Sequence, residues 1–146
     1  MKHIAALTLI AVVAVEASAC SYREMTLPES YRSATSVFRA RVTEVRLAML
    51  PAPRGERSET EVVEAKYEIR EVFKGKPPAD GIVRDMPFGP GNCSLGLFPG
   101  MEYVFFPAMH AMVAAPSGSF GFFNAEGSEV MPKLQILRDL AASSAR

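Results

Sequence analysis

The stretch VEAKYEIREVF, residues 63–73, carries the clearest strand pattern of the chain. Val63, Ala65, Tyr67 and Ile69 alternate with charged side chains at the positions between them. Apolar residues at every second position predict a strand with one face in the core and the other in solvent. This segment therefore favours a mainly β fold.

The segment before it, residues 36–47, predicts the partner strand. Its apolar side chains alternate up to Val42 and then shift by one position. Such a shift predicts a β-bulge near Thr43 and Glu44. Residues 48–60 are rich in proline and charge, which predicts an exposed loop between the two strands.

The remaining segments predict three shorter strands and two helices. Thr26 is a capping residue followed by proline and an acid, and Pro132 opens a segment with leucines at helical spacing. Strands in this number, with a helix at each end, predict a small closed or partly closed β-barrel. The expected elements are a helix over 28–34, strands at 82–86, 101–106 and 119–123, a loop over 88–99 that carries Cys93, and a helix after Pro132.

The N-terminus has the order of a secretory signal peptide. Lys2 precedes an apolar run over residues 4–15, and small residues at 17–19 stand directly before Cys20. The run is shorter than the about 20 residues that a membrane-spanning helix needs. We therefore expect residues 1–19 to be removed and residues 20–146 to form one extracytoplasmic domain, either periplasmic or secreted.

Charge excludes one class of partner. The chain has 16 Lys and Arg against 16 Asp and Glu, and the signal segment removes one of each, Lys2 and Glu16. Binding to nucleic acid depends largely on neutralising phosphates. A nearly neutral domain without a basic run is therefore not expected to bind nucleic acid.

Cys20 and Cys93 are the two cysteines of the chain. In an oxidising compartment an even count favours a disulfide, here between the mature N-terminus and the middle of the chain. The alternative is acylation of Cys20, because a cysteine after Ser18 and Ala19 is similar to a bacterial lipoprotein cleavage site, although Ala17 stands where leucine is usual. A membrane contact is expected only in that second case.

No constellation for catalysis is evident, so we expect no enzyme, no cofactor and no resident metal. His110 is the one histidine left after cleavage and is predicted to lie in a surface loop, and Glu64 and Glu68 are predicted to belong to a solvated strand face. Met109, His110 and Met112 form the one methionine cluster, and thioethers select Cu(I). Methionine in a protein core is the commoner role and is preferred here.

The order of several short motifs resembles that of bacterial proteins similar to the tissue inhibitors of metalloproteinases. The motifs cover most of the mature domain, and each alone is too short to be specific. They are CS at 20–21, SVFRARV at 36–42, YEIREVFKG at 67–75, NCS at 92–94 and FPGMEYVFF at 98–106.

The resemblance implies a netrin-like OB-fold, a five-stranded barrel with a short N-terminal and a C-terminal helix. It also implies a Cys20–Cys93 disulfide, a zinc metalloprotease as partner, chelation of its zinc by the amine and carbonyl of Cys20, and entry of Ser21 into its specificity pocket. The family commonly begins Cys-x-Cys, whereas Tyr22 occupies the third position here. We therefore expect a non-enzymatic binding domain that inhibits a metalloendopeptidase through Cys20, with a lipid-anchored envelope protein that uses the barrel as an interaction module as the alternative.

Overall fold

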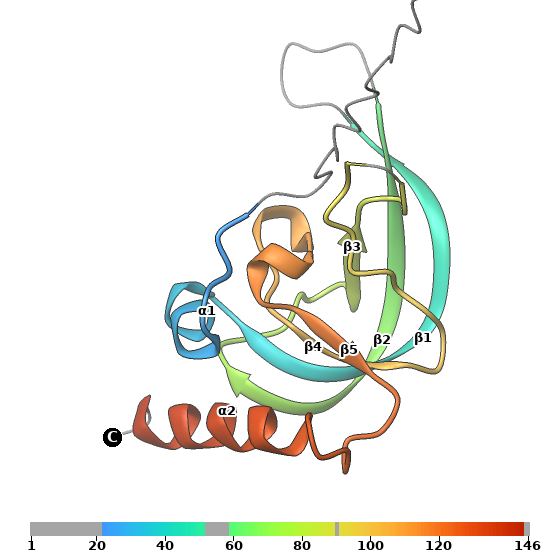
Figure 1. Cartoon of the computed structure of the whole chain (residues 1–146). Helices are drawn as coiled ribbons and strands as arrows, with labels where there is room; N and C mark the ends of the chain where they lie inside the picture. The colour runs from blue at the N-terminus through green and yellow to red at the C-terminus, as the bar shows by residue number, and fades with distance from the viewer. Residues whose placement is uncertain (1–21, 52–58, 90, 145–146) are drawn as a thin grey trace, which may run out of the picture.

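Five antiparallel strands form one curved sheet in the order β3-β2-β1-β4-β5, with a helix near each end of the chain (Figure 1). The computed structural model describes residues 22–51, 59–89 and 91–144. The mainly β fold with two helices is confirmed, but the outer strands β3 and β5 do not pair within the described residues, so the sheet is not closed. The elements are α1 (Leu27–Ser33), β1 (Val37–Leu50), β2 (Thr60–Lys74), β3 (Ile82–Asp85), β4 (Glu102–Phe105), β5 (Phe120–Phe122) and α2 (Met131–Ser144), with two short 3-10 turns, η1 (Met109–Ala111) and η2 (Ala115–Ser117).

β1 is the centre of the sheet because it pairs with β2 along its length and with β4 along its first half. The predicted bulge is confirmed, since the register between β1 and β2 shifts between Val42 and Glu44. Two further shifts place the extra residue on β2, at Arg70 and Phe73. They leave the alternation of β1 intact, which is why the sequence of β1 did not predict them.

The β1–β2 hairpin is longer than predicted. Ala48–Leu50 were expected in a loop, but they continue β1 and pair with Thr60–Val62. The prolines and charges farther along moved the predicted boundary too early. The centre of that loop, residues 52–58, lies outside the described residues.

β4 packs against two hydrophobic clusters, one on each side of the sheet. Tyr103 and Phe105 face a cluster that contains Phe38, whereas Val104 and Phe106 face the cluster built around α2. All four side chains are buried. The prediction of a strand covered on both faces is therefore confirmed, and α2 covers the second face through Leu134 and Leu137.

α1 is fixed to the sheet by hydrogen bonds. Glu29 accepts from the backbone N–H and the hydroxyl of Thr26, each at 2.8 Å, and the first of these bonds is the Glu29 half of a capping box at the predicted helix start. The hydroxyl of Tyr31 donates to the carbonyl of Phe73 at 2.8 Å, and Lys74 Nζ donates to the carbonyl of Tyr31 at 2.8 Å. These contacts set the position of the chain segment that leads into α1.

Replacing Gly75 with alanine is expected to destabilise the domain. Gly75 has φ +60°, and a Cβ atom there would lie 2.2 Å from the carbonyl oxygen of Thr35. Gly81 provides the matched control, because its φ is +67° but no atom lies within 4 Å of the added Cβ. Urea unfolding should show a loss of about 1–3 kcal/mol for Gly81→Ala from backbone strain, and a clearly larger loss for Gly75→Ala. Equal losses would contradict the close approach.

Candidate functional site

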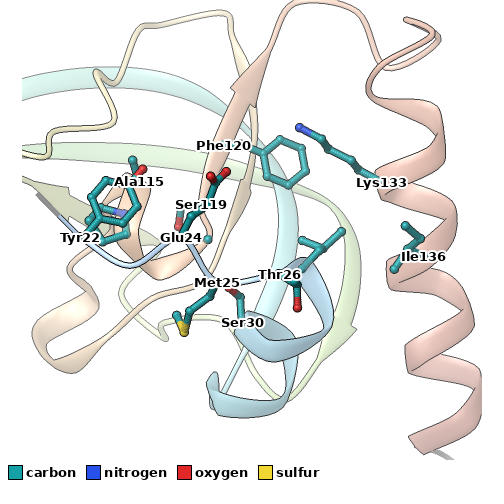
Figure 2. Close-up of a pocket in the computed structure, with 13 residues that line it drawn as sticks. Tyr22, Glu24, Met25, Thr26, Ser30, Ala115, Ser119, Phe120, Lys133 and Ile136 are labelled. Atoms are coloured by element: carbon teal, nitrogen blue, oxygen red, sulfur yellow. The ribbon is translucent and has the colours of Figure 1, made fainter.

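The predicted binding residues are the first two of the predicted mature chain. Cys20 and Ser21 lie outside the described residues, and the first described residue is Tyr22. Tyr22 and Ala115 line one cavity (Figure 2). The backbone N–H of Ala115 donates to the carbonyl of Cys93 at 3.4 Å. The N-terminal segment and the Cys93 loop thus lie on the same side of the domain.

Cys93 is half-buried and is not a free thiol, since the described residues contain no free cysteine. Its loop is irregular, as predicted. The pairing with Cys20 stays a prediction because Cys20 is not among the described residues. A short separation between the two segments is what such a bridge requires.

The loop that carries Cys93 is anchored by a buried carboxylate. Asp85, the last residue of β3, is 1% exposed. Its Oδ2 accepts from the hydroxyl of Ser94 at 2.9 Å and from the N–H groups of Leu95 and Gly96 at 2.8 and 3.0 Å, and its Oδ1 accepts from Met86 N–H at 2.8 Å. Burial raises the pKa of the Asp85 carboxyl, and these four hydrogen bonds oppose the rise.

Tyr103 holds the same loop from the other side. Its hydroxyl accepts from the N–H of Phe98 at 2.9 Å and donates to the carbonyl of Gly96 at 2.8 Å. Asp85 belongs to β3 and the fully buried Tyr103 belongs to β4, so the loop is tied to two strands of the sheet. The sequence did not predict either anchor. An acid at the end of a strand and directly before a proline- and glycine-rich loop was the available signal for Asp85.

A cavity of about 380 Å³ lies beneath the N-terminal segment, between α1, η2, β5 and α2 (Figure 2). Ser30 lines it and is buried, and its Oγ has no hydrogen-bond partner among the residues that the structure describes. Gly118 packs against this hydroxyl so closely that a Cβ atom would lie 2.5 Å from Ser30 Oγ. Glu24 and Lys133 place one charge of each sign among the lining residues.

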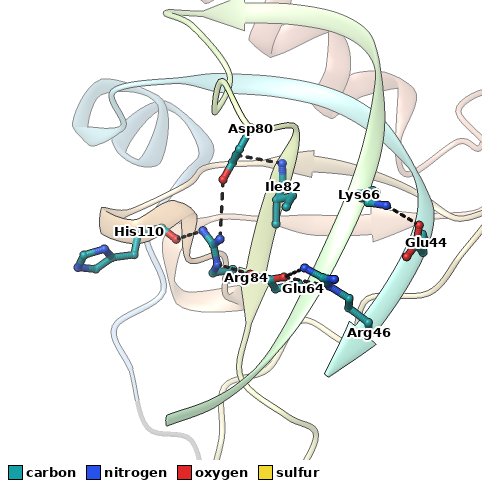
Figure 3. A network of polar contacts seen from close by, with 8 residues as sticks. All are labelled: Glu44, Arg46, Glu64, Lys66, Asp80, Ile82, Arg84 and His110. Carbon is teal, nitrogen blue, oxygen red and sulfur yellow. Dashed lines mark hydrogen bonds and ion pairs between the residues drawn. The ribbon is translucent and has the colours of Figure 1, made fainter. Parts of the chain in front are cut away.

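A second polar cluster lies away from the N-terminus, on β1, β2 and β3 (Figure 3). The prediction that Glu64 is solvated is wrong, because Glu64 is 7% exposed. Arg46 Nη2 and Arg84 Nε contact its two carboxylate oxygens at 2.7 and 2.9 Å. β3 and the two arginines cover Glu64, and sequence alternation on β2 alone could not reveal this cover.

The Glu64 cluster is an ion-pair network that joins three strands. The hydrogen bond from Arg46, and then that from Arg84, hold the pKa of the Glu64 carboxyl below its usual value against the opposing effect of burial. Arg84 Nη1 also donates to the carbonyl of His110 at 3.1 Å. Both carboxylate oxygens of Glu64 accept hydrogen bonds from arginine, so the geometry indicates a structural role for this carboxylate.

His110 lies in a surface turn, as predicted. Its ring points away from the Glu64 cluster, and its backbone has φ 59° and ψ 25° (Figure 3). The prediction that Met109 belongs to the core is wrong, because it is 78% exposed. Met112 is partly buried and its backbone bridges to Arg84 of β3.

Within the described residues, no group of three His, Cys, Asp or Glu side chains is placed to hold a metal ion. None of the helices in this part of the chain is both long and apolar enough to cross a bilayer. Comparison with protein-family models and with the sequences of curated proteins finds no match.

Replacing Asp85 with asparagine is expected to loosen the Cys93 loop. Asparagine offers one acceptor oxygen in place of two, so either the Met86 N–H or the donors of residues 94–96 lose their partner, at a cost of about 1–3 kcal/mol. Hydrogen exchange should be faster at the amides of Leu95 and Gly96, and urea unfolding should show the loss. Asp80→Asn, which changes an exposed acid that accepts from Ile82 N–H, should leave both amides unchanged. Unchanged exchange in Asp85→Asn would show that this carboxylate does not hold the loop.

Glu64 gives a pH dependence whose sign follows from its pKa. The folded pKa is lowered, so its contribution to stability is fully present above the usual value of 4.5 and is lost as the pH falls through the folded pKa. Glu64→Gln should therefore cost about 1–3 kcal/mol at pH 7 and flatten the acid side of the stability profile. Urea unfolding at several pH values measures both effects. Glu61→Gln, an exposed change on the same strand, is the control, and identical profiles for the two variants would contradict the assignment.

Proposed function

We propose that this chain is an extracytoplasmic, non-enzymatic binding domain that inhibits a zinc metalloprotease through the N-terminus of its mature form. In this proposal the domain is a netrin-like OB-fold, similar to the tissue inhibitors of metalloproteinases. The support from the fold is an antiparallel five-stranded sheet in which β1 pairs with both β2 and β4. That arrangement fits a partly open five-stranded barrel.

The observation that carries the proposal is the anchored loop beside the N-terminal segment. Asp85 and Tyr103 hold residues 94–98 by hydrogen bonds. Ala115 donates its N–H to the Cys93 carbonyl and lines the same cavity as Tyr22. A disulfide from Cys20 to such a loop would fix the N-terminus before binding. Ordering the ligand in advance reduces the entropy lost on association.

The proposed chemistry uses the α-amine and the carbonyl of Cys20. An α-amine has a pKa near 8, so its neutral form is accessible to a metal at neutral pH. Binding of both atoms to a catalytic zinc would displace the water that the protease activates. Ser21 would then point into the pocket that selects substrate side chains.

Tyr22 stands where the animal inhibitors commonly have a second cysteine. Here Tyr22 lines the same cavity as Ala115 and Pro116 and is 45% exposed. We infer that its position at this cavity contributes to holding the N-terminal segment. A non-covalent tether leaves the segment less constrained than a disulfide does.

The proposal predicts that blocking the amine abolishes inhibition. The chain is exported so that it begins at Cys20, and a matched variant carries one extra alanine before Cys20. Titration against a panel of zinc metalloprotease catalytic domains should show inhibition by the first form and none by the second. Thermal unfolding should be the same for both, because the extension leaves the fold untouched.

Two results would contradict this mechanism. Equal inhibition by both forms would remove the amine from the binding chemistry. A complete lack of inhibition by the form with a free Cys20 amine would favour the lipid-anchored interaction module instead.

A further inference from the structure

The cavity beneath the N-terminal segment has the size of a small-molecule site. It measures about 380 Å³, near the lower end of the range of about 300–1,000 Å³ for such sites. Leu27, Phe120 and Ile136 give it apolar walls from α1, β5 and α2, and Tyr22 lines it from the segment before α1. An apolar pocket with a few polar groups is typical of a site for an organic molecule.

One buried hydroxyl in this cavity lacks the partner that a helical serine commonly has. Such a serine usually bonds to a carbonyl about one turn earlier, as Ser33 does with the carbonyl of Ser30 at 3.1 Å. The Ser30 hydroxyl has no such bond within the described ranges, although the residue is only 1% exposed. Gly118 keeps the space beside it open, because a Cβ atom there would lie 2.5 Å from Ser30 Oγ. An unpaired buried hydroxyl is costly, so it points to a ligand group in the cavity.

Two charges of opposite sign line the same cavity. Glu24 precedes α1 and Lys133 lies in the first turn of α2, and neither forms an ion pair within the described part of the chain. Lys133 Nζ lies 5.1 Å from the centroid of the Phe120 ring, and Figure 2 shows Glu24 and Lys133 on opposite sides of that ring. A ligand that matches both charges has an ammonium group at one end and a carboxylate at the other.

We propose that this cavity binds a short peptide of two or three residues with apolar side chains. The amine of the peptide pairs with Glu24, its carboxylate pairs with Lys133, and one of its peptide groups hydrogen-bonds to the Ser30 hydroxyl. Its side chains pack against the apolar walls. This site is separate from the Cys20 chemistry and does not depend on protease inhibition.

The dipeptide phenylalanylleucine is the probe. It is titrated into the intact exported protein, and binding is followed by NMR. We expect saturable shifts at the amides of residues 22–26, Phe120 and Lys133. Acetylating the amine of the dipeptide or amidating its carboxylate removes one charge, and each change should weaken binding about three- to fivefold, as expected for an exposed ion pair.

Charge variants show which end of the dipeptide meets which residue. Glu24→Gln should bind the free and the acetylated dipeptide with equal affinity, and Lys133→Gln should bind the free and the amidated dipeptide with equal affinity. Both side chains are exposed, so these variants keep the fold. Glu129→Gln and Lys76→Gln are the matched controls, because both residues are exposed and neither lines the cavity. The controls should keep the full preference for the free dipeptide.

Ser30→Ala separates binding from stability. Removing an unpaired hydroxyl loses no hydrogen bond of the folded protein, so the midpoint of urea unfolding should stay the same or rise. The affinity for the dipeptide should fall about three- to tenfold, because the hydrogen bond to the ligand is lost. A hydroxyl with only a structural role would instead lower the midpoint and leave the affinity unchanged.

The proposal is overturned if the dipeptide causes no saturable shifts, or if its acetylated and amidated forms bind as well as the free form. Equal affinities in Glu24→Gln and Glu129→Gln would overturn the assignment of the amine to Glu24. A preference for the free dipeptide that is lost only in the two cavity variants supports it. None of these measurements uses a protease, so their failure leaves the Cys20 proposal as it stands.

Discussion

The carboxylate of Asp85 is the constraint on which the candidate site depends. It ends β3 and accepts four hydrogen bonds, three of them from consecutive residues of the loop that carries Cys93. A buried carboxylate is costly unless it is hydrogen-bonded, so the loop and the acid stabilise each other. Tyr103 closes the arrangement from β4 and makes this loop part of the rigid sheet.

The N-terminal segment lies between two surface cavities. Met25 lines both the cavity that contains Tyr22 and the cavity that contains Met109. Residues 22–26 therefore pass between two cavities. Their C-terminal end leads into α1, which the Tyr31 hydroxyl holds against the sheet. Because the proposed protease contact lies just before it, the position of this segment bears directly on the proposed function.

The parts of the fold that follow from local pattern were predictable from the sequence. The bulge after Val42, the doubly covered strand β4 and the cap at Thr26 all leave a signature within a few residues. The parts that depend on distant segments were not. Glu64 is buried because Arg46 and Arg84 reach it from neighbouring strands, and alternation along β2 contains no information about them.

The candidate site divides in the same way. Cys93 and the surface position of His110 could be named from the sequence, whereas Asp85 and the exposure of Met109 required the fold. Ile69 is the simplest case in which the sequence pattern alone gave the wrong exposure for a side chain. It was expected to face the core, but β3 covers only Val63–Lys66, so Ile69 lies on a stretch of β2 without an outer neighbour and is 49% exposed.

The central claim concerns one atom, the amine nitrogen of Cys20, and the intact mass of the mature protein from its native host tests it most directly. The account predicts a mass two hydrogens below that of residues 20–146, which increases by two hydrogens on reduction, because the amine is free and Cys20 is bridged to Cys93. A mass heavier by a diacylglyceryl group, together with a titratable thiol, would contradict it, because an acylated N-terminus cannot chelate zinc.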